Sequence, residues 1–207
     1  RRVLKIAGVK ELINGNHNII GDRIEAFSYL CVGAISRGTI IVRNINPIFL
    51  SNELNVLKKL GCTVKAENNS ISIKSKKILK PLKINTGPYP KFATDNMPAL
   101  LAVLSTVKGK SEINETIFSN RFMAAPELSR MGAIIKIKKN KAIIQGQKKL
   151  IGADCISSDL RTTFSIILGA LAAKGISKVQ RVYHGLRGYY NLIGKLKKVG
   201  INIKSSE

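Results

Sequence analysis

The chain has 207 residues, of which 44% are hydrophobic and 23% charged, the balance of a globular protein that can bury a core. No apolar run approaches the roughly 18 residues of a membrane span, and the opening residues have no signal-peptide pattern, so a cytoplasmic protein without a membrane partner is expected. Cys31, Cys62 and Cys155 are far apart in apolar settings, which predicts reduced core thiols, no metal site and no cofactor.

The formal net charge is +23, which raises three interpretations: a nucleic-acid partner, an anionic ligand, or a drift of composition toward Lys. Lys outnumbers Arg 25 to 10, and the lysines lie in short, scattered runs. The chain has no Trp and only 11 Phe and Tyr residues, so a surface for stacking bases is not indicated. Drift is therefore favoured, and a basic nucleic-acid-binding domain is kept as an alternative.

Three similar segments follow one another, at about residues 22–74, 95–146 and 159–207. Each begins at an Asp and continues with an apolar helix, a strand, a loop and an amphipathic helix. A strand hairpin is predicted to follow in each segment, indicated in the first two by apolar alternation around residues 63–66 and 71–73 and around 135–137 and 142–144. The third segment stops at Ile203, before the last strand of its own hairpin. Glycines are expected to end the helices. These glycines are Gly38, Gly61, Gly109, Gly132, Gly175 and Gly200.

Residues 4–15 resemble residues 142–152, the passage that ends the second segment and leads to the third. Residues 1–21 are therefore predicted to be a returning N-terminal strand and loop that closes the third repeat. The sequence thus predicts a single α/β domain (α+β repeats) over residues 1–207, built from three repeats.

The three Asp residues that open the repeats suggest two different roles. Asp22 is predicted to be a plain helix N-cap. Asp95 follows a loop containing Pro88 and Pro90, and Thr94 could itself cap the helix, which would leave the Asp95 carboxylate free to face a ligand. Asp159 lies at the start of an apolar helix, two residues before Arg161.

Three arginines stand at or just before predicted helix starts in a chain that otherwise prefers Lys: Arg121, Arg161 and Arg187. A helix N-terminus favours an anion, and the guanidinium fork suits carboxylate and phosphate. Surface ion pairs are the alternative interpretation of these residues. If the arginines and aspartates meet at one end of the domain, they would form a site for an anionic substrate, with a carboxylate able to take a proton.

Five stretches, T-D-N-M, E-T-I-F-S-N-R-F-M, P-E-L-S-R-M-G-A, S-D-L-R and R-V-Y-H…R-G-Y, occur in this order. Together they resemble the UDP-N-acetylglucosamine 1-carboxyvinyltransferases, a family of enolpyruvyl transferases, and the resemblance runs over essentially the whole chain. It implies an inside-out α/β barrel domain of three repeats, one of two such domains that enclose the active site. Leu186, Ala124 and Phe164 depart from the family's pattern.

The resemblance implies transfer of the enolpyruvyl group from phosphoenolpyruvate to the 3-hydroxyl of UDP-N-acetylglucosamine, the first committed step of peptidoglycan synthesis. The implied catalytic residues are Asp95, Arg121, Asp159 and Arg187. The implied substrate-binding residues are Thr94, Asp95, Ile117, Arg121, Asp159, Leu160, Arg161 and Arg187.

The resemblance also implies a partner catalytic domain, absent from these residues, that carries the family's Lys-Asn pair and its Cys. None of the three cysteines here matches that Cys. The isolated chain is therefore expected to hold half of the site and to be inactive alone. Besides the nucleic-acid-binding domain, the other alternative is a non-catalytic remnant that binds UDP-sugar.

Overall fold

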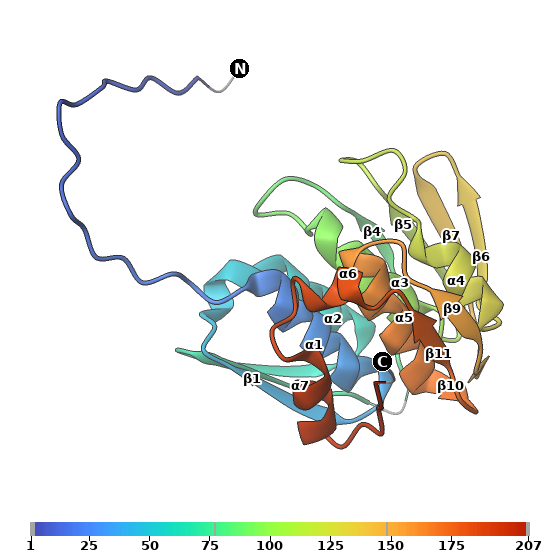
Figure 1. The fold of residues 1–207 in the computed structure, drawn as a ribbon. Coiled ribbons are helices and arrows are strands. Elements are labelled where there is room, and N and C mark those ends of the chain that lie inside the picture. The colour runs from blue at the N-terminus through green and yellow to red at the C-terminus, as the bar shows by residue number, and fades with distance from the viewer. Residues whose placement is uncertain (1–2, 77, 148, 206–207) are drawn as a thin grey trace.

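The computed structural model describes residues 3–76, 78–147 and 149–205 (Figure 1). Its elements can be grouped in chain order under the three predicted repeats, although the strands Lys83–Asn85, Leu150–Ile151 and Asp154–Ile156 lie before the predicted starts of the second and third. The elements of the first repeat are α1 (Arg23–Ile35), β1 (Thr39–Arg43), the 3-10 helix η1 (Pro47–Leu50), α2 (Ser51–Leu60), β2 (Thr63–Glu67) and β3 (Ser70–Lys74). Those of the second are β4 (Lys83–Asn85), the 3-10 helix η2 (Thr94–Asn96), α3 (Met97–Leu104), β5 (Gly109–Asn114), α4 (Ala124–Arg130), β6 (Ile134–Lys138) and β7 (Lys141–Gly146). Those of the third are β8 (Leu150–Ile151), β9 (Asp154–Ile156), α5 (Leu160–Ala172), β10 (Ala173–Lys174), β11 (Lys178–Gln180), α6 (Tyr183–Leu186) and α7 (Leu192–Lys198).

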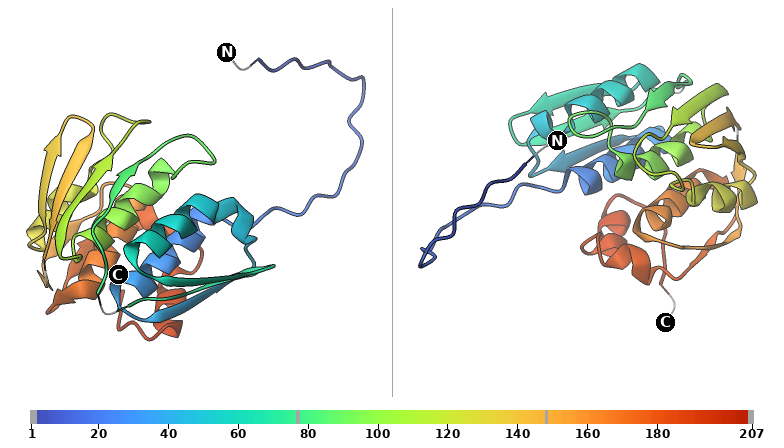
Figure 2. Two further views of the ribbon diagram at one scale, coloured as in Figure 1. Left: turned by 180° about the vertical axis from the view of Figure 1, so that it is seen from behind. Right: turned by 90° about the horizontal axis from the view of Figure 1, so that it is seen from above.

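The first helix of each repeat, α1, α3 and α5, lies at the centre of the molecule, and the three pack against one another. All eight residues of α3 are buried, as expected for a helix that is apolar on every side. The second helix of the first repeat, α2, is amphipathic and buries only one face, through Leu54, Leu57 and Leu60 among others. The two larger sheets lie outside the central helices (Figure 2).

The predicted hairpins form in the first two repeats. In the first, β3 is the middle strand and pairs antiparallel with both β1 and β2. In the second, β7 pairs antiparallel with β5 and β6, and β4 joins the edge parallel to β5. The third repeat instead contributes two short parallel pairs, β8 with β10 and β9 with β11. The described strands therefore form four separate sheets, and a closed barrel is not confirmed.

The predicted N-terminal strand does not form. Residues 3–20 have no regular secondary structure, their side chains are exposed, and Figure 1 shows the segment leading away from the body. An extended segment becomes a strand only when neighbouring strands satisfy its backbone groups. The third repeat offers no such neighbour, because residues 201–205, which follow α7, are not in a strand either.

Glycine ends the second helix of every repeat, as predicted. Gly61, Gly132 and Gly200 follow α2, α4 and α7 with φ values of 109°, 87° and 85°, in the left-handed region that costs a glycine little. The prediction was wrong for the first helix of every repeat. After α1, Arg37 with φ 57° takes the left-handed conformation and Gly38 does not. Gly109 is the first residue of β5, and Gly175 follows β10, since α5 already ends at Ala172.

The longest helices, α1 and α5, have 13 residues each. Within the described ranges, none of the helices combines the length and the apolar character that crossing a bilayer requires. The described residues also contain no cluster of three or more His, Cys, Asp and Glu side chains able to hold a metal ion.

Candidate active site

The starts of two central helices and the loop before α4 converge on one pocket. Asp95 lies in η2, directly before α3, and Asp159 directly precedes α5. Arg121 comes from the loop between β5 and α4. The pocket has a volume of about 530 Å³. It is lined by Asp95, Pro98, Phe118, Ser119, Asn120, Arg121, Met123, Asp159, Leu160, Arg161, Thr162 and Arg187.

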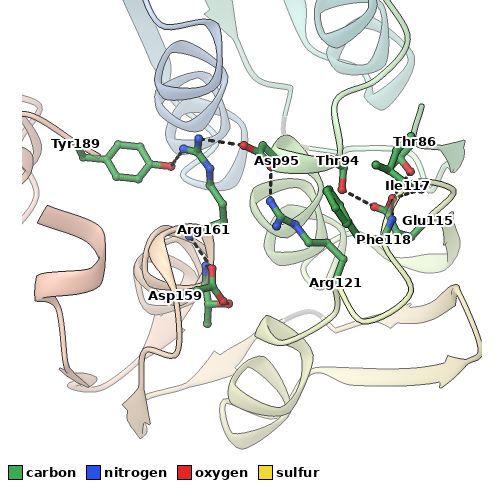
Figure 3. A network of polar contacts seen from close by, with 11 residues as sticks. Thr86, Thr94, Asp95, Glu115, Ile117, Phe118, Arg121, Asp159, Arg161 and Tyr189 are labelled. Carbon is green, nitrogen blue, oxygen red and sulfur yellow. Dashed lines mark hydrogen bonds and ion pairs between the residues drawn. The ribbon is translucent and has the colours of Figure 1, made fainter. Parts of the chain in front are cut away.

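The Asp95 carboxylate lies between two guanidinium groups (Figure 3). One oxygen accepts a hydrogen bond from Arg121, and the other accepts one from Arg161 at 3.2 Å. The side chains of Asp95, Arg121 and Arg161 are 37%, 28% and 13% exposed, so the cluster is partly shielded and still open to the pocket. As predicted, the Asp95 carboxylate makes no capping contact. It is not free, however, because each oxygen is paired with an arginine.

Tyr189 supports Arg161. It belongs to the R-G-Y part of the sequence motif but was not recognised as a site residue. The Tyr189 hydroxyl accepts from Arg161 at 3.3 Å (Figure 3). The same hydroxyl lies 2.9 Å from the Ser28 hydroxyl of α1. Burial alone lowers the pKa of Arg161, but Tyr189 and the Asp95 carboxylate raise it above its ordinary value. Arg161 therefore stays cationic in a partly buried site.

The Tyr189 ring is fixed by Phe164, one of the residues that depart from the family's pattern. The two rings stack with their centroids 4.7 Å apart, and the Tyr29 ring meets Phe164 edge-on at 5.4 Å. Phe164 thus fills the space behind Arg161 and joins α5 to α1 and to the segment after α6.

Asp159 caps α5 and also lines the pocket. One carboxylate oxygen accepts from the backbone N–H groups of Arg161 and Thr162 at 2.8 and 2.9 Å, and the other from the Thr162 hydroxyl at 2.6 Å. Burial raises the pKa of Asp159, but these hydrogen bonds outweigh it and hold the pKa below its ordinary value. Asp22 caps α1 in the same way, as predicted, accepting from Ile24 and Glu25.

Replacing Asp159 by Ala should lower the free energy of unfolding by about 1 to 2 kcal/mol at neutral pH, because α5 loses its cap. The folded-state pKa lies below the unfolded-state value of about 3.9. The carboxylate therefore stabilises the fold above that pH, and the contribution is lost as the pH falls through the folded-state pKa. Urea unfolding of both proteins at pH 7 and near pH 3 checks this, and a stability difference that grows on acidification contradicts it.

Arg187 lies just after α6, is exposed, and lines the same pocket. Two glycines let this segment approach α5 closely. A Cβ added at Gly188 would lie 2.7 Å from Leu160, and one at Gly185 would lie 2.6 Å from Thr163. Leu186, which departs from the family's pattern, is exposed beside Arg187.

Thr94 and Ile117, the other two predicted site residues, are adjacent to the pocket but do not line it. The prediction that Thr94 caps the following helix was wrong, because its hydroxyl donates to Glu115 at 2.8 Å. The Ile117 backbone N–H also donates to Glu115, at 2.7 Å. Glu115 was quoted in the sequence motif but not recognised as a site residue.

A second pocket, of about 660 Å³, lies at the end of β1 and the turn between β2 and β3. Arg43 and Glu67 are both in its lining, so its cationic and anionic groups balance. The cluster of Arg121, Arg161 and Arg187 makes the smaller pocket the better candidate for an anionic ligand.

The sequence profile described as EPSP synthase (3-phosphoshikimate 1-carboxyvinyltransferase) matches residues 1–196. The chain belongs to this family. Within the EPSP synthase family, UDP-N-acetylglucosamine 1-carboxyvinyltransferase from Pelagibacter ubique is 43% identical over 204 residues, which is 99% of this chain and 49% of that protein. The protein of the same name from Campylobacter lari is 45% identical over 189 residues, 91% of this chain and 45% of that protein. The resemblance predicted from the loops is confirmed.

Solved structures support the fold of the EPSP synthase family as well. The enolpyruvyl transferase NikO from Streptomyces tendae superposes with a TM-score of 0.81 at 24% identity, over 90% of this chain and 44% of that one. The chain spans about half the length of the curated relatives it matches.

Proposed function

We propose that this chain forms one wall of an active site that transfers the enolpyruvyl group of phosphoenolpyruvate to the 3-hydroxyl of UDP-N-acetylglucosamine. The observation that supports the proposal is the placement of Asp95 between Arg121 and Arg161, with Arg187 in the same pocket. A carboxylate there can accept the proton of a sugar hydroxyl. The arginines supply donors for the phosphate and carboxylate of phosphoenolpyruvate.

The same contacts suggest how substrate binding prepares the base. Without a ligand, Arg121 and Arg161 compensate the charge of Asp95. An anionic substrate competes with Asp95 for these guanidinium groups, because charge-assisted hydrogen bonds to phosphate have the same geometry as those to carboxylate. Once the substrate takes these donors, the Asp95 oxygens become available to the hydroxyl proton.

The other wall of the site is proposed to come from the half of the family's length that these residues do not cover. The family's Lys-Asn pair and Cys would belong to that half, and the isolated chain would not turn over. The exposed apolar side chains of the N-terminal segment, such as Val3, Leu4 and Ile6, favour a neighbouring surface that buries them.

Titration of the chain with phosphoenolpyruvate tests the anion site. Replacing Arg121 by Ala should weaken binding by about 10-fold or more, because a hydrogen bond to a charged group is worth about 1.5 to 3 kcal/mol. Arg130→Ala is the matched control, since Arg130 lies at the exposed end of α4 and pairs with Glu127 instead. Equal affinity of the two variants contradicts the proposal. DNA binding that neither substitution changes would favour the basic nucleic-acid-binding alternative.

A further inference from the structure

Glu115 is a buried carboxylate that lies directly after β5 and has a relative exposure of 1%. None of the ion pairs among the described residues includes it. One oxygen accepts from the Thr86 hydroxyl at 2.8 Å and from the N–H groups of Ile117 and Phe118 at 2.7 and 3.2 Å. The other accepts from the Thr94 hydroxyl at 2.8 Å. These four neutral donors replace the water that burial removes from the carboxylate.

The donors belong to the two loops that carry the candidate site. Thr94 directly precedes Asp95 in η2. Ile117 and Phe118 begin the loop that ends at Arg121, and the Arg121 guanidinium lies over the Phe118 ring, 5.5 Å from its centroid. Figure 3 shows Glu115 bonded to Thr94 beside Asp95 and to the loop that leads to Arg121. A single carboxylate therefore connects the two partners of the Asp95–Arg121 pair.

Glu53 provides an informative contrast. It is also a buried carboxylate, and it accepts from the Ala93 N–H and from the Asn96 amide, both at 3.1 Å. Both donors belong to the Asp95 side of the pair. Glu53 thus accepts hydrogen bonds only from the segment that carries Asp95, whereas Glu115 accepts them from that segment and from the loop that carries Arg121.

We infer that Glu115 is a positioning residue that sets the spacing between the Asp95 carboxylate and the Arg121 guanidinium. The inference rests on the proposed function for the role of that pair, and the contacts themselves do not depend on it. Removing the carboxylate leaves two backbone N–H groups and two hydroxyls without their acceptor, so both loops must rearrange. Glu115 is not among the residues that line the pocket and acts through Thr94, Ile117 and Phe118.

Nuclear magnetic resonance on the ligand-free 207-residue chain tests the inference without any substrate. In Glu115→Ala, amide hydrogen exchange at Ile117 and Phe118 should accelerate by about 10-fold or more, and the side-chain N–H signals of Arg121 should shift. Glu115→Gln should leave both readouts at their wild-type values. Its amide oxygen can accept the hydrogen bonds from Thr86, Ile117 and Phe118, and its NH₂ group can donate to the Thr94 hydroxyl.

Two further variants make the experiment specific. Glu112→Gln removes a carboxylate from β5 itself, where Glu112 pairs with surface lysines, and should change neither readout. Thr94→Val removes only the bond on the Asp95 side, so it should shift the Arg121 signals and leave exchange at Ile117 unchanged. If Glu115→Ala fails to fold, Thr94→Val and Glu115→Gln still decide the question. The inference is overturned if neither Glu115→Ala nor Thr94→Val moves the Arg121 signals, or if Gln perturbs them as strongly as Ala.

Titration with phosphoenolpyruvate separates this inference from the proposed function. If both hold, Glu115→Ala should weaken binding by about 10-fold and Glu115→Gln should stay near the wild-type affinity. A wild-type chain that does not bind phosphoenolpyruvate, while the Arg121 signals respond as expected, contradicts the proposed function and leaves the positioning role of Glu115 confirmed. Wild-type binding that Glu115→Ala leaves unchanged overturns the positioning role alone.

Discussion

Replacing Asp95 by Asn should lower the turnover of the enzyme that joins this chain to its missing half by about 10² to 10⁴-fold, the usual contribution of a general base. Asn has the same shape as Asp but cannot accept the proton of the sugar hydroxyl. Affinity for phosphoenolpyruvate should be retained or increased, because Arg121 and Arg161 no longer face a competing carboxylate. Steady-state kinetics would then show a lower kcat without a higher KM for phosphoenolpyruvate.

Asp154→Asn is the matched control, since Asp154 is exposed at the start of β9 and should leave turnover unchanged. A D95N enzyme with wild-type kcat contradicts the role of Asp95 as the base. A D95N enzyme whose only defect is a raised KM for phosphoenolpyruvate would make Asp95 a binding residue instead. An interaction that is equally strong in the bound substrate and in the transition state affects KM and leaves kcat unchanged.

Replacing Phe164 by Ala should lower the free energy of unfolding by about 3 to 5 kcal/mol, the usual cost of removing a buried aromatic ring. Phe164 is 1% exposed and packs between Tyr29 and Tyr189, so the cavity opens where the α5 helix meets α1. Urea unfolding followed by circular dichroism measures the loss. Tyr190→Ala, at a ring that is 82% exposed, is the control and should change stability by no more than about 0.5 kcal/mol.

The Phe164 variant should also weaken binding of an anion at Arg161, because Tyr189 loses the ring against which it stacks. Phe164→Leu, which keeps most of the apolar volume but not the stacking, should lose less stability than Ala. A Phe164→Ala protein as stable as the wild type would mean that the aromatic cluster is not part of the core.

The buried helices, two of the helix N-caps and the glycines after the second helices were predictable from the sequence because local chemistry determines them. An all-apolar stretch such as Met97–Leu104 must be buried, wherever the rest of the chain goes. The caps at Asp22 and Asp159 depend on backbone N–H groups two and three residues away. The backbone after α2, α4 and α7 likewise takes a positive φ, which a glycine adopts at little cost.

The site was only partly predictable. Asp95, Arg121, Arg161 and Arg187 were recognised from motifs, and the structure brings all four to one pocket. Tyr189 was missed because its role depends on Arg161, 28 residues earlier, and on Ser28, 161 residues earlier. A Tyr in a loop carries no local pattern that distinguishes a buried hydroxyl acceptor from an exposed ring.

The N-terminal strand shows the opposite error, in which a local pattern was given too much weight. Residues 4–15 resemble residues 142–152, which contain strands, but strands need partners, and the described part of the third repeat offers none to residues 4–15. The sequence by itself determined the residue types that face the pocket and, through the resemblance of its motifs, the family, because both can be recognised in short stretches of the chain. Only the tertiary structure decided that Asp95 lies between two arginines and that Glu115 joins their loops, because these contacts connect residues that are 21 to 66 positions apart in the sequence.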